Sequence, residues 1–145
     1  MTLIGDDAER WNAEGEVGWY LGLEPAVVLA EWARHLDEGV EMTVWKVRLA
    51  PLRVLDLRSP DVMTRLGLPS DPSWTLDVER TRSVAGEIRN EGSAEALIVP
   101  SVAFLDRSAT HANLVVLLDD REGVRILVQD ARRVGDWSWE DGAGR

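Results

Sequence analysis

The stretch Glu9–Leu23, ERWNAEGEVGWYLGL, guides the interpretation of the whole sequence. It places an arginine between an acid and a tryptophan, and a short region of small residues separates these from Trp19 and Tyr20. Residues 17–23 have the alternation and the aromatic content of a β-strand. A turn that brings Arg10 close to aromatic side chains indicates one wall of a site for a flat or anionic ligand.

The residues that follow predict a helix, two strands and a second, short helix. Pro25 is favoured at the first position of a helix, and the apolar run after it extends that helix to about Leu36. The short helix has Ser59 as its cap and Gly67 just past its end. The two strands lie between the helices, over residues 42–49 and 53–57.

The second half of the chain predicts a loop, a longer helix and three strands. Two prolines and several polar residues make 68–75 a loop. The remaining elements are a helix from about Leu76 to Asn90, a strand over 96–100, and a hairpin of strands 113–119 and 124–129. Residues 130–145 read as a loose tail. The predicted fold is therefore α+β with a mixed sheet and flanking helices, in one domain of residues 1–145 with its core at about 9–129.

Composition limits the class of function. Acidic residues outnumber basic ones 26 to 16, for a net charge of −10, and the bases form no stripe, which disfavours direct nucleic-acid binding. The chain has no cysteine, so thiolate catalysis and cysteine-based zinc sites are excluded. We find no signal peptide and no apolar run of membrane-spanning length, and we expect a soluble cytoplasmic protein without membrane contact.

Glu31 lies within an unusually apolar helix. On a helical wheel the core-facing stripe contains Leu29, Trp32, Ala33 and Leu36, and Glu31 lies on the far side. Val27 and Val28 make the first two turns apolar nearly all round, so a helix buried on both sides would need Glu31 to be hydrogen-bonded or paired. The alternative is an exposed acid that pairs with Arg34.

The other candidate residues also have ordinary structural explanations. For Arg10 the alternative is a loose surface ion pair with Glu9. For Tyr20 it is a core residue whose hydroxyl is hydrogen-bonded. Ser101 and Asn113 are both suited to capping a turn. Neither His35 nor His111 has an acid or histidine at metal-ligand spacing, so we expect no metal site. Trp137 and Trp139 are candidates for a partner surface or for a loosely packed tail.

The order of these motifs resembles the RES domain family, which is named for its arginine, glutamate and serine. The matching residues are Arg10-Trp11-Asn12, Tyr20-Leu21, "LAEW" with Glu31, "VPS" with Ser101 and "HANLVVL" with Asn113. The stretch VLDLRSPDVMTRLGL is similar to the middle segment of the family. The resemblance extends from about Glu9 to Gln129.

The resemblance implies a fold similar to ADP-ribosyltransferase toxins and an enzyme that consumes NAD. Family members cleave NAD by phosphorolysis or hydrolysis, or transfer ADP-ribose to a protein, and are typically neutralised by a helix-turn-helix antitoxin. Glu31 would then stabilise positive charge on the ribose, because breaking the nicotinamide–ribose bond leaves the sugar carbon cationic. Arg10 would bind the diphosphate, Tyr20 would stack on nicotinamide, and Ser101 and Asn113 would lie near the ribose.

Two departures from the family pattern favour an alternative. Ala8-Glu9 stands where the family usually has a glycine pair, and nine residues precede Arg10 where relatives usually carry a strand and a helix. An acid beside the arginine weakens the case for NAD binding, and a missing segment leaves a sheet edge for a partner or dimer mate to cover. The alternative is a catalytically degenerate RES-like module that acts by binding a protein.

Overall fold

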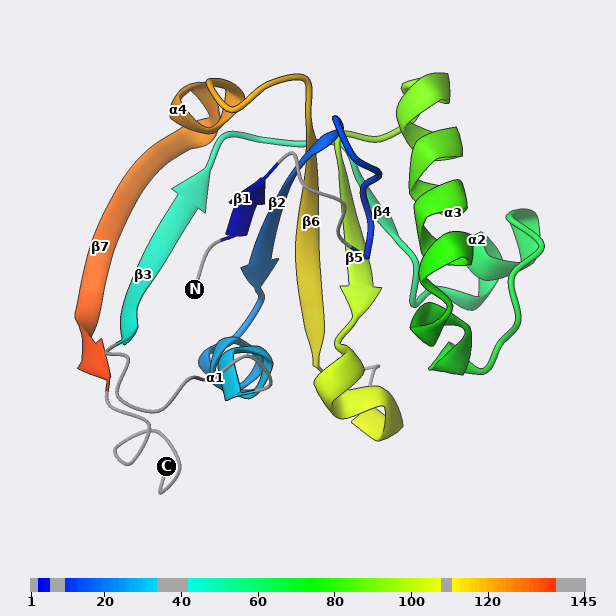
Figure 1. The fold of residues 1–145 in the computed structure, drawn as a ribbon, viewed down its shortest axis with the longest axis horizontal. Helices are drawn as coiled ribbons and strands as arrows, with labels where there is room; N and C mark the ends of the chain where they lie inside the picture. Colours follow the sequence, from blue (N-terminus) through cyan, green and yellow to red (C-terminus); the bar gives the residue numbers. More distant parts are fainter. Residues whose placement is uncertain (1–2, 6–9, 34–41, 108–110, 138–145) are drawn as a thin grey trace.

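A five-stranded sheet forms the centre of the fold (Figure 1). The computed structural model describes residues 3–5, 10–33, 42–107 and 111–137. The strand order is β1-β2-β6-β5-β4, and only the β4–β5 pair is parallel. The strands are β1 (Leu3–Gly5), β2 (Val17–Gly22), β4 (Val54–Asp56), β5 (Ala96–Pro100) and β6 (Ala112–Leu118).

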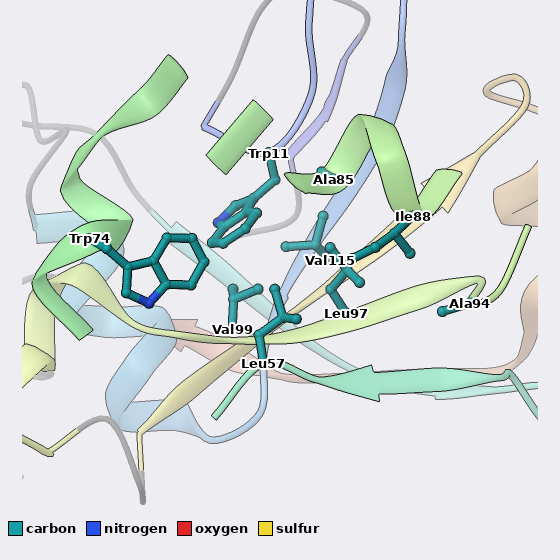
Figure 2. Packing of buried hydrophobic residues seen from close by; sticks show 9 residues of the cluster. All are labelled: Trp11, Leu57, Trp74, Ala85, Ile88, Ala94, Leu97, Val99 and Val115. Carbon is teal, nitrogen blue, oxygen red and sulfur yellow. The ribbon is translucent and has the colours of Figure 1, made fainter. Parts of the chain in front are cut away.

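One face of this sheet packs against α3 (Val78–Glu91) and the 3-10 helix η1 (Pro72–Leu76). The side chains of a strand alternate between its two faces, so every second residue of β5 and β6 enters the core on this side. Figure 2 shows the cluster, in which the rings of Trp11 and Trp74 meet edge to face at 5.8 Å. Its buried members are Trp11, Leu57, Trp74, Ala85, Ile88, Ala94, Leu97, Val99 and Val115.

The other face packs against a separate two-stranded sheet of β3 (Met42–Leu49) and β7 (Val128–Trp137). Trp19 and Val116 are almost fully buried between the two sheets. Val47 and Leu49 of β3 pack against the same cluster. The central sheet is thus covered on both faces, by helices on one side and by a second sheet on the other (Figure 1).

The short helices connect these layers. They are α1 (Pro25–Ala33), α2 (Pro60–Arg65), α4 (Gly123–Leu127) and the 3-10 segment η2 (Val102–Arg107). Ser59 precedes α2 and Pro60 begins it, as predicted, although the Ser59 side chain makes no capping bond. Asp77 caps α3 by accepting a hydrogen bond from the Arg80 amide at 3.1 Å. Gly92 ends α3 with a φ of 65°, in the left-handed region that glycine adopts readily.

The predicted α+β class, with a mixed sheet and flanking helices, is confirmed. The strands expected near 17–23, 42–49, 53–57 and 96–100 are all present. These segments carry strong local signals, either alternation or a short β-rich run bounded by turn residues. No described helix is both long and apolar enough to cross a membrane.

Three predictions for the second half of the chain, those of a loop, a hairpin and a loose tail, differ from the structure. Residues 72–75, expected in a loop, belong to η1, because Asp71 accepts a hydrogen bond from Ser73 N at 2.9 Å and Pro72 starts the helix. The expected hairpin of 113–119 with 124–129 does not form. Gly123–Leu127 is helical, and the strand that follows pairs with β3, so the tail predicted from residue 130 is ordered as β7 up to Trp137.

Two expectations for the first third of the chain also change. Leu3–Gly5 pairs with β2, so part of the sheet edge expected to be open is covered by the chain itself. In α1, Val27 is fully buried and Leu29 is half-buried, so the buried side of the helix includes Val27, which the predicted stripe left out. The side chains of Trp32 and Ala33, two other members of that stripe, lie outside the described ones. Leu36, Arg34, Glu9, His35 and Trp139 lie outside the described residues.

Candidate active site

The candidate site lies at the end of the sheet where β2 and β5 end and β6 begins (Figure 1). Tyr20 pairs with Val115, and Asn113 pairs with both Gly22 and Val99. Because residues two apart share a face, Tyr20, Asn113 and Val99 point to the same side of the sheet. Ser101 directly follows β5 and is two residues beyond Val99. The sheet register therefore brings Tyr20, Asn113 and Ser101 to the same end of the sheet.

Glu31 is held at this end of the sheet by two hydrogen-bond donors. Ser101 Oγ donates a hydrogen bond to Glu31 Oε1 at 2.6 Å, and Asn113 Nδ2 contacts the same oxygen at 3.4 Å. Ser101 is completely buried, whereas Glu31 and Asn113 are half-buried. The carboxylate of an otherwise apolar helix is thus fixed by polar groups from β5 and β6. It is not an exposed acid, so the interpretation of Glu31 as a solvated surface residue is wrong.

Close packing of α1 on β2 sets the position of Glu31. A Cβ atom on Gly22 would lie 2.5 Å from Val28 Cγ2 and 3.1 Å from Val28 N, so only glycine allows this approach. Val27 is fully buried beside it. Leu23 N donates to the carbonyl of Ala112 at 3.1 Å, which ties the start of α1 to β6.

His111 makes a second tie between α1 and β6. Its Nδ1 is hydrogen-bonded to Glu24 Oε1, and its ring packs against Phe104 at 4.4 Å. Its carbonyl accepts from Ser101 N at 3.2 Å. The residue before β6 therefore contacts both the residue before α1 and the serine that holds Glu31.

Arg10 approaches from the turn before β2 and is anchored on the helical layer. Its Nη1 donates to the carbonyl of Thr75 in η1 at 2.7 Å. Its own carbonyl accepts a hydrogen bond from Thr81 Oγ1 of α3. Both ends of the residue are thereby tied to segments more than 60 positions away in the chain.

Tyr20 is oriented through its hydroxyl group. The hydroxyl accepts a hydrogen bond from Trp11 N at 3.1 Å and donates one to Asn12 Oδ1. Asn12 is fully buried and also donates to the carbonyl of Glu16 at 2.9 Å. The turn that precedes β2 and the tyrosine within β2 therefore form one hydrogen-bonded unit.

The predicted site residues form two hydrogen-bonded groups. One contains Glu31, Ser101 and Asn113, and the other joins the Arg10–Asn12 turn to Tyr20. The sheet register connects them, because Tyr20 and Asn113 are diagonal neighbours on adjacent strands, about 7–8 Å apart.

Sequence reasoning missed three buried polar residues next to Arg10 and Tyr20. Asn12, Thr75 and Thr81 are each 0% exposed. Asn12 was visible as part of the Arg-Trp-Asn motif, but it was given no role. Thr75 and Thr81 carry no local signal of a contact with Arg10, because Arg10 lies 65 and 71 positions away from them in the chain.

A small cavity lies apart from the predicted site residues, none of which lines it. Its volume is about 90 Å³, and its walls reach Trp74, next to Thr75, and Pro100, next to Ser101. Arg58 is its charged wall residue and contacts Asp56 at 2.8 Å. The hydrogen bond from the Arg58 side chain holds the pKa of Asp56 below its ordinary value of 3.8.

The sequence of residues 4–140 matches the RES domain family. The chain belongs to the RES domain family. The match includes every residue of the candidate site, from Arg10 to Asn113. A comparison with curated proteins gives no match.

A solved structure shares the fold of this RES domain. It is a chain from the crystal structure of the M. tuberculosis MbcT–MbcA toxin–antitoxin complex. The TM-score is 0.66 at 18% sequence identity, and the alignment covers 98% of the present chain and 80% of the other. At this identity the likeness concerns the fold.

Within the described ranges, no group of three histidine or acidic residues is arranged to hold a metal ion. His111, the histidine that is described, contacts Glu24. The two hydrogen-bonded groups supply a carboxylate held by Ser101 and Asn113, an arginine held by Thr75, and a tyrosine held by Asn12.

Proposed function

We propose that the protein is an NAD-consuming toxin that cleaves the bond between nicotinamide and ribose. The observation that carries the proposal is the carboxylate of Glu31, held by Ser101 at 2.6 Å on the same face of the sheet as Tyr20. Cleavage of this bond leaves a cationic sugar carbon, and a fixed carboxylate stabilises that charge without having to reorganise. Membership of the RES domain family supports the same chemistry.

Each site residue has a distinct role in this proposal. Glu31 stabilises the oxocarbenium ion or binds the ribose hydroxyls. Ser101 and Asn113 hold its carboxylate and lie near the same ribose. The guanidinium group of Arg10 binds the diphosphate, since a planar guanidinium pairs well with phosphate oxygens. The ring of Tyr20 stacks on nicotinamide, while its hydroxyl is hydrogen-bonded to Trp11 and Asn12 in the turn before β2.

The proposed biological role is that of a toxin neutralised by a cognate antitoxin in the cytoplasm. The fold is shared with a chain from a toxin–antitoxin complex, which supports this role. An antitoxin of helix-turn-helix type would use its basic surface for DNA, and the acidic present chain would contact its other domain. The acceptor of ADP-ribose is phosphate, water or a protein side chain.

The test is the release of nicotinamide from NAD by the purified protein, with and without phosphate. We expect release from the wild type and a rate about 10²–10³-fold lower in Glu31→Gln, which keeps the shape of the side chain and removes its charge. Glu87→Gln, an exposed acid on α3, is the matched control and should release nicotinamide at the wild-type rate. A phosphate-dependent rate would identify phosphate as the acceptor. Release from Glu31→Gln at the wild-type rate would contradict the proposal, and no release from the folded wild type would favour a protein-binding module.

A further inference from the structure

Two buried polar side chains outside the proposed reaction centre are hydrogen-bonded to Arg10 and Tyr20, the residues proposed to bind the ligand. Thr81 lies on α3 and Asn12 lies in the turn before β2, and both are 0% exposed. A buried polar group destabilises a fold unless its hydrogen bonds are made. The partners of these two side chains therefore show what each one does in the molecule.

Thr81 holds the main chain of Arg10. Its hydroxyl contacts two carbonyl oxygens, that of Arg10 and, at 3.0 Å, that of Val78 one turn earlier in α3. A hydroxyl has one proton to donate. The Arg10 contact is the shorter of the two, so we assign the proton to it.

The tip of Arg10 is held by the same helical layer. Arg10 Nη1 donates to Thr75 O at 2.7 Å, and Thr75 is itself fixed because its Oγ1 donates to the carbonyl of Pro72 at 2.8 Å. Thr81 therefore fixes the position of the Arg10 carbonyl, and η1 fixes the position of the Arg10 guanidinium group.

Asn12 holds the hydroxyl of Tyr20. Its Oδ1 accepts from the hydroxyl, and its Nδ2 donates to Glu16 O at 2.9 Å, so the amide cannot turn without losing both bonds. A Cβ atom on Gly18 would lie 3.1 Å from both Asn12 Oδ1 and Tyr20 Cε2. The asparagine and the ring therefore pack closely over the backbone of Gly18.

We infer that Thr81 and Asn12 are positioning residues, Thr81 for Arg10 and Asn12 for Tyr20. This inference rests on the proposed function, in which Arg10 binds the diphosphate and Tyr20 the nicotinamide. Side chains that are already ordered before a ligand arrives bind it more tightly, because less conformational entropy is lost on binding. Thr81 therefore acts on the affinity for any ligand with the diphosphate, and Asn12 only on the affinity for ligands with nicotinamide.

Two ligands separate the two roles. NAD contains both the diphosphate and nicotinamide, while ADP-ribose lacks nicotinamide. We expect Thr81→Val, which replaces the hydroxyl with a methyl group, to raise the KM for NAD and the Kd for ADP-ribose about threefold to tenfold. We expect Asn12→Leu to raise the KM for NAD by a similar factor and to leave the Kd for ADP-ribose within about twofold of wild type.

Conservative variants distinguish positioning from a general loss of structure. Thr81→Ser keeps the donor and should restore wild-type KM and Kd, and Thr64→Val, on the exposed surface of α2, should change neither. If Asn12 acts through Tyr20, its removal should cost little in a Tyr20→Phe background, since interacting residues are non-additive. Should Asn12→Leu fail to fold, Tyr20→Phe removes the same hydrogen bond while keeping the ring, and it should raise the KM for NAD with the Kd for ADP-ribose within about twofold of wild type.

Unchanged KM and Kd in folded Thr81→Val, or equal weakening of both ligands in Asn12→Leu, would overturn the inference. So would a wild type that binds no ADP-ribose in calorimetry. Failure of the proposed function alone has a different signature, because the wild type would then bind ADP-ribose without a release of nicotinamide that depends on Glu31.

Discussion

The catalytic carboxylate proposed here depends on two donors of unequal quality. Ser101 Oγ is 2.6 Å from Glu31 Oε1 and fully buried, while Asn113 Nδ2 is 3.4 Å away and half-buried. We therefore expect Ser101→Ala to lower kcat for nicotinamide release on the order of a hundredfold, because a small displacement of a catalytic group has that effect. Asn113→Leu should have a smaller effect. The reverse order of the two kcat values would show that Ser101 does not hold the carboxylate.

The Asp56–Arg58 pair gives a second prediction for single residues. The hydrogen bond from Arg58 lowers the pKa of Asp56 in the folded protein, so the pair stabilises the fold fully above the unfolded-state pKa. That contribution is lost as the pH falls through the lower, folded-state value. In urea titrations, Asp56→Asn should have a lower free energy of unfolding than the wild type at about pH 6, and the two should differ little at about pH 2. Asp119→Asn, an exposed control, should show the same change in the free energy of unfolding between the two pH values as the wild type does.

At the residue scale, sequence reasoning found the side chains that face a ligand but not those that hold them. Glu31, Ser101 and Asn113 were predicted from motif order, and the structure brings them within hydrogen-bonding distance. Thr81 and Asn12 were given no role, because a threonine in the middle of a helix is unremarkable until its carbonyl partner is known. That partner, Arg10, lies 71 positions away.

At the scale of elements, the contact of α1 with β2 gives the next prediction. A methyl group on Gly22 would lie 2.5 Å from Val28 Cγ2 and 3.1 Å from Val28 N, so we expect Gly22→Ala to displace α1 and with it Glu31. We expect a loss of about 1–3 kcal/mol in the free energy of unfolding and a fall in kcat. Gly86→Ala is the control, because nothing lies within 4 Å of that Cβ, and it should stabilise α3 by about 0.5–1 kcal/mol. Equal behaviour of the two variants would contradict this view of α1.

Whole elements were predictable where their signals are local. The strand 42–49 alternates clearly, and its bounds are those of β3. Residues 124–127 were assigned to a strand and are helical, because a short apolar run fits a helix or a strand equally well. Nothing in that run indicates that the strand after it pairs with residues 42–49 rather than with its neighbour β6.

At the scale of the whole molecule, Arg89 ties the helical layer to the central sheet. Its Nη1 donates to Leu118 O at 2.8 Å and its Nη2 to Val17 O at 3.1 Å, and these two residues are partners in the β2–β6 pair. Arg89→Met removes both donors, and we expect it to lower the free energy of unfolding in urea by roughly 2–3 kcal/mol. Arg80→Met, exposed on the same helix, should change it little. Equal effects would show that the two layers do not depend on this contact.

The fold as a whole places the carboxylate on one element and its donors on two others. Glu31 is on α1, Ser101 follows β5 and Asn113 is in β6, so the site exists only when the sheet is complete. The most direct test is a double-mutant cycle of Glu31→Gln and Ser101→Ala, read as the rate of nicotinamide release. If Ser101 acts by holding Glu31, the double variant is no slower than Glu31→Gln alone. Rates that fall by the product of the two single effects would contradict the account.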